Sequence, residues 1–209
     1  IKKIYMKKKI GILETGPANY LSIKNAIKKI GYESIIINKK NISKIKVSHL
    51  ILPGVGSFDG VMKNLKKNNY INYIKEFSKL NKPILGICIG YQILFEKSTE
   101  GKLNGLGFFK GQFKSLKNLL KITPNVGWIK VKGDKRMIKN FGYKKQIFFY
   151  FSHSYYLTSY KKSDIAGYIY IKHKMIPAVL VNKNIFGFQF HPEKSAEEGL
   201  LFLKLFCEK

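Results

Sequence analysis

Short apolar runs alternate with longer amphipathic segments in the first half of the chain. Residues 9–14 form an apolar run that ends before Gly16 and Pro17, which predicts a buried strand followed by a loop. Apolar residues then recur at helical spacing between Asn19 and Gly31, which predicts a helix. The same alternation predicts strands at 34–38, 47–52 and 84–87 and helices at 59–79 and 90–97. Strands that alternate with helices indicate an α/β fold, with an open, mostly parallel sheet and helices on both of its faces.

The second half of the chain is rich in phenylalanine, tyrosine, isoleucine and glycine. Runs typical of strands lie at 106–113, 127–132, 147–151, 166–171, 178–181 and 185–190. They predict added antiparallel β elements that cover one end of the sheet, before a last helix at 195–207. No linker, repeat or change of composition divides the chain. We therefore expect a single domain at 9–209 that follows an N-terminal extension at 1–8.

The chain has 209 residues and a formal net charge of +27, which on its own suggests a protein that binds nucleic acid. However, its 39 basic residues are spread along the whole chain, and Arg136 is the only arginine. Arginine makes the bidentate contacts to phosphate and guanine that proteins use to recognise nucleic acid. We therefore interpret the lysines as solvated surface residues, and a basic nucleic-acid-binding module is a remote alternative.

The two cysteines, Cys88 and Cys207, are too few for a disulfide framework, which predicts a reducing compartment. No apolar run approaches the ~18 residues of a transmembrane helix. The first residues also lack the apolar segment and the cleavage site of a signal peptide, so we expect a cytoplasmic protein. The sequence contains no characteristic spacing of metal ligands, and we expect neither a metal nor a cofactor.

Cys88 lies between Gly86 and Gly90, at the point where an apolar strand meets a helix. This pattern is typical of a nucleophile elbow, in which a strained turn raises the nucleophile above the edge of a sheet. The N-terminus of the following helix favours the thiolate over the thiol. A lone cysteine at the end of a buried strand is more often an inert core residue, so this motif leaves both interpretations open.

His191 and Glu193 follow an apolar strand near the end of the chain, in the run GFQFHPEK. In an extended segment residues i and i+2 face the same side, so the Glu193 carboxylate can orient the His191 imidazole. A cysteine, a histidine and an orienting acid are the three parts of an activated thiol site. The alternative is a surface turn with no catalytic role.

A glycine-rich turn, PGVGSF at 53–58, directly follows the strand at 47–52. Because parallel strands end at the same edge of a sheet, we expect this turn to lie beside Cys88. Its glycines would let main-chain N–H groups approach a developing oxyanion, with the N–H of Ile89 as a second donor. An ordinary tight turn and a phosphate-binding loop are the alternatives, although no P-loop motif follows.

Four motifs, in order along the chain, resemble those of the class I glutamine amidotransferases. They are PGVGSFDGVMKNL at 53–65, KPILGICIGYQILFEKSTEG at 82–101, FYFSHSYYL at 149–157 and GFQFHPEKS at 187–195. Within that family the chain is most similar to the glutaminase subunit of imidazole glycerol phosphate synthase, from about Lys9 to Phe206. The resemblance implies the family's flavodoxin-like fold and a glutamine amidotransferase domain over residues 9–209.

The resemblance also implies the roles of the site residues. Cys88 would attack the side-chain amide of glutamine and form a thioester, His191 would transfer protons, and Glu193 would orient His191. A carboxylate such as Glu100 suits the α-ammonium group of the substrate, and an amide such as Gln92 suits its polar ends. The substrate-binding residues implied in this way are Gly54, Val55, Gly56, Ile89, Gln92, Glu100, Ser152, His153, Ser154 and Tyr155.

The family pairs this subunit with a (β/α)₈ barrel cyclase that receives the ammonia. The resemblance places Lys194, Trp128 and Asn19 at or near that interface. Where the family usually has Pro-His-Met-Gly-Trp-Asn, this chain has PNVGWI at 124–129, so the tryptophan is kept and the histidine and asparagine are not. Two fates of the ammonia therefore remain open. It would serve the synthesis of histidine and a purine precursor, or, in a paralogous subunit, the amidation of surface-polysaccharide sugars.

Overall fold

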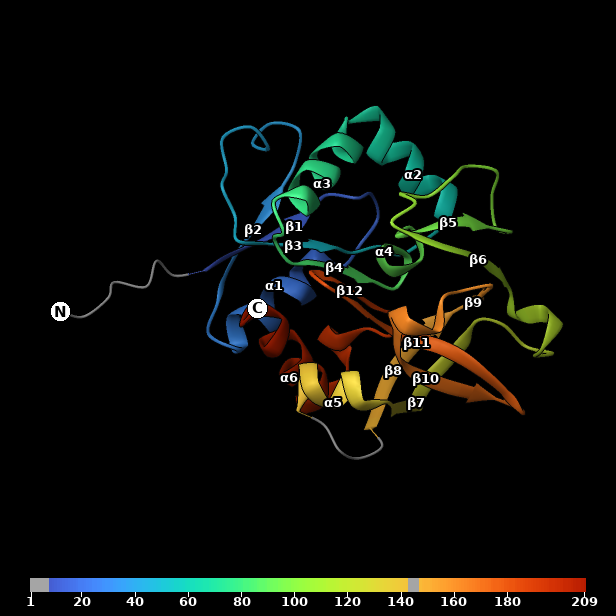
Figure 1. Ribbon diagram of the computed structural model, residues 1–209. Coiled ribbons are helices and arrows are strands. Elements are labelled where there is room, and N and C mark those ends of the chain that lie inside the picture. The colour runs from blue at the N-terminus through green and yellow to red at the C-terminus, as the bar shows by residue number, and fades with distance from the viewer. Residues whose placement is uncertain (1–7, 143–146) are drawn as a thin grey trace.

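The computed structural model describes residues 8–142 and 147–209, which fold around a nine-stranded sheet (Figure 1). Its strand order is β2-β1-β3-β4-β12-β11-β10-β7-β8. The first five strands of this order pair in parallel, and most of their residues are buried, as expected for strands covered on both faces. They are β2 (Glu33–Ile37), β1 (Lys9–Leu13), β3 (His49–Leu52), β4 (Ile84–Ile87) and β12 (Ile185–Phe188). The predicted α/β fold is confirmed.

Four antiparallel strands extend the same sheet beyond β12. They are β11 (Lys174–Asn182), β10 (Ile165–Ile171), β7 (Asn125–Gly133) and β8 (Ile147–His153). A separate three-stranded sheet contains β5 (Phe95–Ser98), β6 (Phe109–Ser115) and β9 (Tyr155–Thr158). The predicted antiparallel elements are thus present, but most of them continue the large sheet edge to edge instead of covering one of its ends.

Helices lie on both faces of the parallel half of the sheet (Figure 1). One face carries α2 (Phe58–Lys67) and α3 (Tyr70–Lys79), and the other carries α1 (Tyr20–Lys29) and α6 (Ala196–Cys207). Next to α6, α5 (Lys135–Phe141) packs against the antiparallel strands β7, β10 and β11. The shorter helical segments are α4 (Ile89–Gln92) and the 3₁₀ helices η1 (Leu116–Asn118), η2 (Lys162–Asp164) and η3 (Pro192–Lys194). The predicted N-terminal extension lies outside the described residues, except for Lys8.

The helix predicted at 59–79 is two helices. Asn69 adopts a left-handed conformation, with φ of 59°, between α2 and α3. Asparagine is one of the few residues with a side chain that tolerates this region. The apolar period continues across the break, and for this reason the sequence pattern does not reveal it.

The prediction of a helix at 90–97 is wrong beyond the first turn. α4 ends at Gln92, and the chain becomes extended from Phe95 onward in β5. Phe95 pairs with Phe109 of β6, and its ring lies edge-on to that of Phe113 with 5.5 Å between centroids. Burial in this aromatic cluster outweighs the local helical pattern, which is a weak preference.

A stack of aromatic rings holds the segment that leads to His191. The fully buried ring of Phe190 is stacked on Phe149 of β8, with 3.9 Å between centroids, and on Phe188, at 5.0 Å. Phe202 of α6 packs edge-on against both Phe188 and Phe190. Burying a phenylalanine contributes about 1.5–3 kcal/mol. Because Phe190 directly precedes His191, this core anchors the main chain of the histidine.

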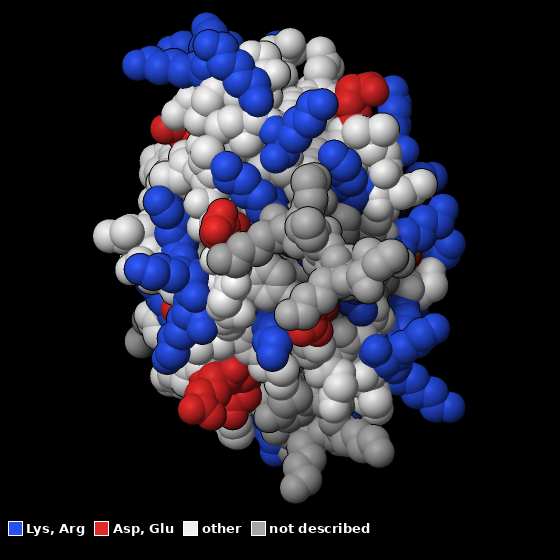
Figure 2. Space-filling view, turned by 90° about the vertical axis from the view of Figure 1, so that its left-hand side faces the viewer, with Lys and Arg blue, Asp and Glu red and all other residues white. Residues whose placement is uncertain are grey.

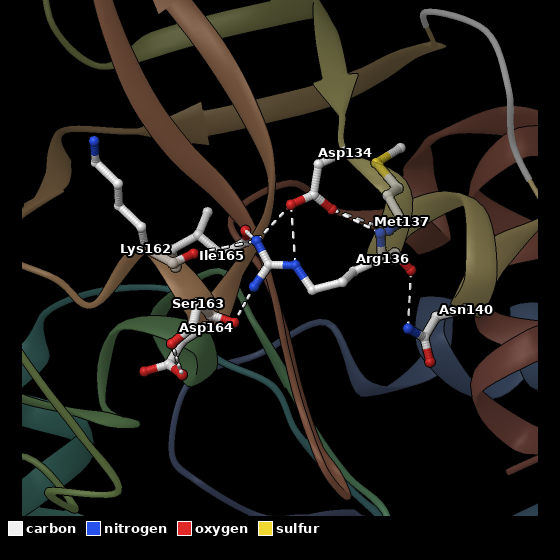
Figure 3. Close-up of polar contacts among 8 residues, drawn as sticks. All are labelled: Asp134, Arg136, Met137, Asn140, Lys162, Ser163, Asp164 and Ile165. Carbon is white, nitrogen blue, oxygen red and sulfur yellow. Dashed lines mark hydrogen bonds and ion pairs between the residues drawn. The ribbon is translucent and has the colours of Figure 1, made fainter.

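The only arginine of the chain connects α5 to the segment before β10 (Figure 3). The guanidinium of Arg136 donates to the carboxylate of Asp134 and to the main-chain carbonyls of Lys162, Ser163 and Ile165. Asp134 in turn accepts from the main-chain N–H groups at the start of α5. This fork-shaped set of donors is a geometry that lysine does not offer.

Lysine side chains do not gather into one patch on the face shown in Figure 2. They are scattered among uncharged side chains, with acidic groups between them. Over residues 8–142 and 147–209, no helix is long and apolar enough to cross a membrane. The same residues contain no group of three or more His, Cys, Asp or Glu side chains that could hold a metal ion.

Candidate active site

Cys88 occupies a strained turn between β4 and α4. Its φ of 55° lies in the left-handed region, which residues with a side chain rarely adopt. A Cβ atom at Gly90 would lie 1.7 Å from the carbonyl oxygen of Leu52, and one at Gly86 would lie 2.4 Å from the carbonyl oxygen of Gly90. Both neighbouring glycines are therefore required by close main-chain contacts, and the turn has the geometry of a nucleophile elbow.

His191 and Glu193 lie just beyond β12, beside this turn. Nδ1 of His191 lies 2.9 Å from Oε1 of Glu193, as the i, i+2 spacing predicts. Their side chains are only 6% and 3% exposed, so water competes little with this contact. His191 lines the same cavity as Cys88, and interaction with the Cys88 side chain helps to raise its pKa. Three chemically active side chains from two distant segments therefore meet at one edge of the sheet.

The electrostatics of this cluster favour a charged imidazole. Burial opposes protonation of His191, but its hydrogen bonds and charge interactions with Cys88 and Glu193 outweigh burial and raise its pKa to about 10. A buried imidazolium between a thiol and a carboxylate is the arrangement of an activated cysteine. Chemically, such a cluster can form and hydrolyse a thioester.

Two further groups contact the sulfur of Cys88. Its Sγ lies 3.7 Å from the carbonyl oxygen of Ser152, to which the thiol can donate. Nε2 of Gln189 lies 3.9 Å from the same sulfur and can donate to it. Oε1 of Gln189 accepts from Nε2 of Gln92 over 3.1 Å. The nucleophile thus lies against a buried chain of two amides.

A cavity of about 190 Å³ opens in front of Cys88. Most of the substrate-binding residues expected from the resemblance line it, and Pro124 and Lys194 line it as well. The expected residues at its wall are Val55, Gly56, Cys88, Ile89, Gln92, Glu100, Ser152, His153, Ser154, Tyr155 and His191. Gly54 and Glu193 lie behind this wall, where they line a second, smaller cavity.

The glycine-rich turn lies beside the elbow, as expected from strand order. A Cβ atom at Gly54 would be 3.0 Å from Cβ of Ile89. The main-chain N–H of Val55, however, donates to the carbonyl oxygen of Pro17 over 3.0 Å. This donor of the turn is therefore engaged by the loop before α1, whereas the N–H of Ile89 stands at the first position of α4 and has no acceptor within that helix.

Glu100 and Gln92 are two polar residues of the cavity wall. Oε2 of Glu100 accepts from the main-chain N–H of Phe58 over 2.7 Å. Burial and the nearby Asp59 raise the pKa of Glu100, although the hydrogen bond from Phe58 acts against this rise. Gln92 also lines the cavity, and its buried Oε1 has no hydrogen-bond partner among the described residues.

The three residues expected at a partner interface have different surroundings. Trp128 is 50% exposed on β7, and its ring packs edge-on against Tyr150 of β8. Nζ of Lys194 lies over the ring of the same Tyr150, 5.7 Å from its centroid. Asn19 instead caps α1, because its side chain accepts from the N–H of Ser22. It also lines the small cavity next to Glu193.

Gln189 and Pro124 are site residues that the sequence reasoning missed. Gln189 stands two positions before His191, so the period of two that links His191 to Glu193 also points to Gln189. Pro124 reaches the cavity only through the pairing of β7 with β8, and a local motif does not reveal that contact.

Sequence comparisons with known proteins show the family to which the chain belongs. The sequence model of the family "Glutamine amidotransferase class-I" matches residues 12–208. The chain is 40% identical over 195 residues to "Imidazole glycerol phosphate synthase subunit HisH" of Prochlorococcus marinus, with 93% of this chain and 91% of that protein covered. It is 42% identical over 203 residues to the HisH subunit of Caldanaerobacter subterraneus, with 95% and 97% covered.

Solved structures show the same fold at low sequence identity. "Structure of PurLQS from Thermotoga maritima" has a TM-score of 0.76 at 17% identity and covers 97% of this chain and 99% of its own. "Crystal structure of glutamine amidotransferase" has a TM-score of 0.72 at 15% identity, with 94% and 98% covered. The family match over nearly the whole chain, together with relatives at about 40% identity, shows that the chain belongs to the class I glutamine amidotransferases.

Proposed function

We propose that the chain is the glutaminase subunit of imidazole glycerol phosphate synthase. It hydrolyses glutamine to glutamate and ammonia in the cytoplasm, and the ammonia passes to a (β/α)₈ barrel cyclase for histidine and purine-precursor synthesis. The observation that carries the chemistry is the buried pair of His191 and Glu193 at the cavity that Cys88 also lines. The names of the relatives at about 40% identity support the pathway.

In the proposed reaction, the Cys88 thiolate attacks the side-chain amide carbon of glutamine. The His191 imidazolium donates its proton to the leaving nitrogen, so that ammonia leaves and a γ-glutamyl thioester remains on Cys88. Neutral His191 then takes a proton from water, which attacks the thioester and releases glutamate. Glu193 holds Nδ1 throughout and stabilises the imidazolium each time it forms.

The cavity offers complementary groups to glutamine. The carboxylate of Glu100 suits the α-ammonium group, and the free acceptor Oε1 of Gln92 suits an N–H group of the substrate. The polar segment from Ser152 to Tyr155 also lines this cavity. These contacts orient the amide carbon toward Cys88, and such orientation is a large part of catalysis in reactions of this type.

The oxyanion of the tetrahedral intermediate needs two donors beside Cys88. We assign one to the N–H of Ile89, at the start of α4. The second comes from the glycine-rich turn, where the N–H of Val55 is bonded to Pro17. The turn therefore supplies either the N–H of Gly56 or the N–H of Val55 after its release from Pro17.

The exposed face of the β7–β8 pair is the surface that we assign to the cyclase. Val126 and Trp128 of β7 and Phe148 of β8 are each about half exposed there, and Trp128 lies directly opposite Tyr150. Ser152 of the same pair lines the cavity, so this apolar surface reaches its mouth. A partner seated on this face covers the route of ammonia, which is protonated in water at neutral pH and is then no longer a nucleophile.

The surface-polysaccharide alternative depends on the sequence 124–129. Asn125, one of the altered residues, is partly buried and bonds to His153, whereas Val126 and Trp128 are exposed. The altered residues on the exposed side are fewer than the sequence alone suggests, which favours the histidine pathway.

The test uses the purified complex of this chain with a barrel cyclase. Cys88→Ala should abolish glutamine-dependent turnover and leave ammonia-dependent turnover intact, because the cyclase then needs only free ammonia. Cys207→Ala, a second buried cysteine outside the site, is the matched control and should leave both activities unchanged. Loss of both activities in Cys88→Ala would contradict the proposal, as would a complex that turns over no glutamine before any substitution.

A further inference from the structure

The sequence around Ser195 predicts that its side chain caps a helix, but the side chain does not do so. Ser195 is followed three residues later by Glu198, the pattern of a capping box in which the serine hydroxyl caps its own helix. Ser195 does stand at the N-cap position of α6, but its side chain makes no capping hydrogen bond there. Its hydroxyl is therefore available for another purpose.

The hydroxyl instead bridges the His191 segment and β8. Oγ of Ser195 donates to the carbonyl oxygen of His191 over 2.6 Å and accepts from the main-chain N–H of Tyr150 over 2.9 Å. The N–H of His191 donates to the carbonyl oxygen of the same Tyr150 over 2.9 Å. The N–H of His191 is thus bonded directly to Tyr150 of β8, and the C=O of His191 is linked to the same residue through the Ser195 hydroxyl.

The surroundings of Ser195 leave the bridge little room to rearrange. Ser195 is completely buried, so water does not compete for its hydrogen bonds. A Cβ atom at Gly199 would lie 2.0 Å from the carbonyl oxygen of Pro192, so the first turn of α6 packs closely against η3. Ala196 has a φ of 49°, a strained conformation that persists only where neighbouring contacts hold it.

The strand on the other side of the bridge also belongs to the active site. β8 carries Ser152, whose carbonyl oxygen lies 3.7 Å from Sγ of Cys88 and which lines the cavity. A displacement of His191 relative to β8 is therefore a displacement relative to the nucleophile. The groups suited to glutamine itself, Gln92 and Glu100, are not attached to Ser195, so its loss should leave substrate binding nearly intact.

We propose that Ser195 is a positioning residue, whose hydroxyl fixes the main chain of His191 against β8 so that the imidazole keeps its contact with Glu193 and its place at the cavity beside Cys88. This inference depends on the proposed glutaminase reaction. Misplacing a catalytic group by a fraction of the contact distance lowers the rate of the chemical step more than the affinity for substrate.

The test compares Ser195→Ala with the unsubstituted chain in the cyclase complex. We expect kcat for glutamine to fall about 10- to 100-fold, in line with the cost of misorienting a catalytic group. The KM for glutamine should change less than about twofold, and ammonia-dependent turnover should be unchanged. A covalent glutamine analogue that reacts with Cys88 counts the folded active sites. Dividing the rate by this count gives kcat per folded site, so partial unfolding does not lower it.

Three further variants separate positioning from general stabilisation. Ser195→Thr keeps the hydroxyl and should recover most of the lost kcat per titrated site. Glu198→Ala removes the second member of the capping pattern and should leave kcat unchanged. Ser48→Ala is the matched control, since its hydroxyl also donates to a main-chain carbonyl, that of Lys9, at the opposite edge of the sheet.

An unchanged kcat in Ser195→Ala would overturn the proposal. It would also be overturned by a raised KM at constant kcat, or by a loss that Glu198→Ala reproduces. Each of these results leaves the glutaminase assignment standing, because that assignment depends on the separate outcome of Cys88→Ala.

Discussion

Asn125 donates a hydrogen bond from its side-chain amide to Nε2 of His153, its direct neighbour across β7 and β8, over 3.1 Å. Nδ1 of His153 lies 2.9 Å from the carbonyl oxygen of Tyr155, which can only accept, so Nδ1 carries the proton and Nε2 accepts. Burial lowers the pKa of His153 to about 4. The chain therefore holds a neutral histidine next to the charged His191, and Asn125 stabilises this state.

Replacement Asn125→Asp should reverse this preference. A carboxylate can only accept, so it favours protonation of Nε2, and the pKa of His153 should rise. A second positive charge would then oppose the His191 imidazolium, and glutaminase kcat should fall severalfold. Titration of the His153 ring by NMR measures the first effect. An unaltered His153 titration would show that Asn125 does not control its protonation.

His191 and His153 should make the free energy of unfolding depend on pH in opposite directions. The pKa of His191 is raised from 6.5 to about 10 in the folded chain, despite burial, by its contacts with Cys88 and Glu193. Its contribution to stability is therefore complete below pH 6.5 and is lost as the pH rises toward 10. Burial lowers the pKa of His153 from 6.5 to about 4, so stability is lost as the pH falls through that range.

Urea unfolding between pH 4 and pH 10 measures both slopes. We expect a maximum of the unfolding free energy near pH 6.5, where neither loss has developed. His191→Gln should flatten the alkaline slope and leave the acidic slope in place. If the alkaline slope survives this substitution, the imidazolium is not its origin.

Gln189→Leu should slow the chemistry at Cys88. The substitution removes the amide that donates to Sγ and leaves Nε2 of Gln92 without its acceptor. We expect alkylation of Cys88 by iodoacetamide at pH 7 to slow several-fold, because a thiolate is stabilised by a nearby donor. Gln189→Glu should slow it further, since a carboxylate disfavours the thiolate.

Gln112→Leu, which alters a half-buried glutamine of β6 outside the site, is the control for this comparison. Equal alkylation rates in Gln189→Leu and the unsubstituted chain would mean that Gln189 does not act on the sulfur.

Arg136→Lys should destabilise the chain although it keeps the charge. A lysine ammonium cannot reach Asp134 and the carbonyls of Lys162, Ser163 and Ile165 at once, as the guanidinium does (Figure 3). Because the group is partly exposed, we expect a loss of about 1 kcal/mol, which lowers Tm by a few degrees in a chain of this size. Lys139→Ala on the same helix is the control, and an unchanged Tm in Arg136→Lys would contradict the structural role.

Local pattern was sufficient for the parts of this protein that depend on local geometry. The strand at 9–14 and the helix after Asn19 follow from apolar spacing, since period and secondary structure are directly related. The turn at Cys88 follows from its two glycines, because only glycine permits the contacts found at Gly86 and Gly90. The contact of His191 with Glu193 follows from the period of two in an extended segment.

Tertiary structure decided which partner each polar group found. The N–H of Val55 donates to Pro17, and the side chain of Asn125 bonds to His153. The hydroxyl of Ser195 does not cap its own helix and instead bonds to His191 and Tyr150. The extended chain at Phe95, against a helical pattern, has the same origin in a distant aromatic cluster. Each of these contacts joins segments that are apart in sequence or competes with a local alternative, and the packing of the whole core determines which contact forms.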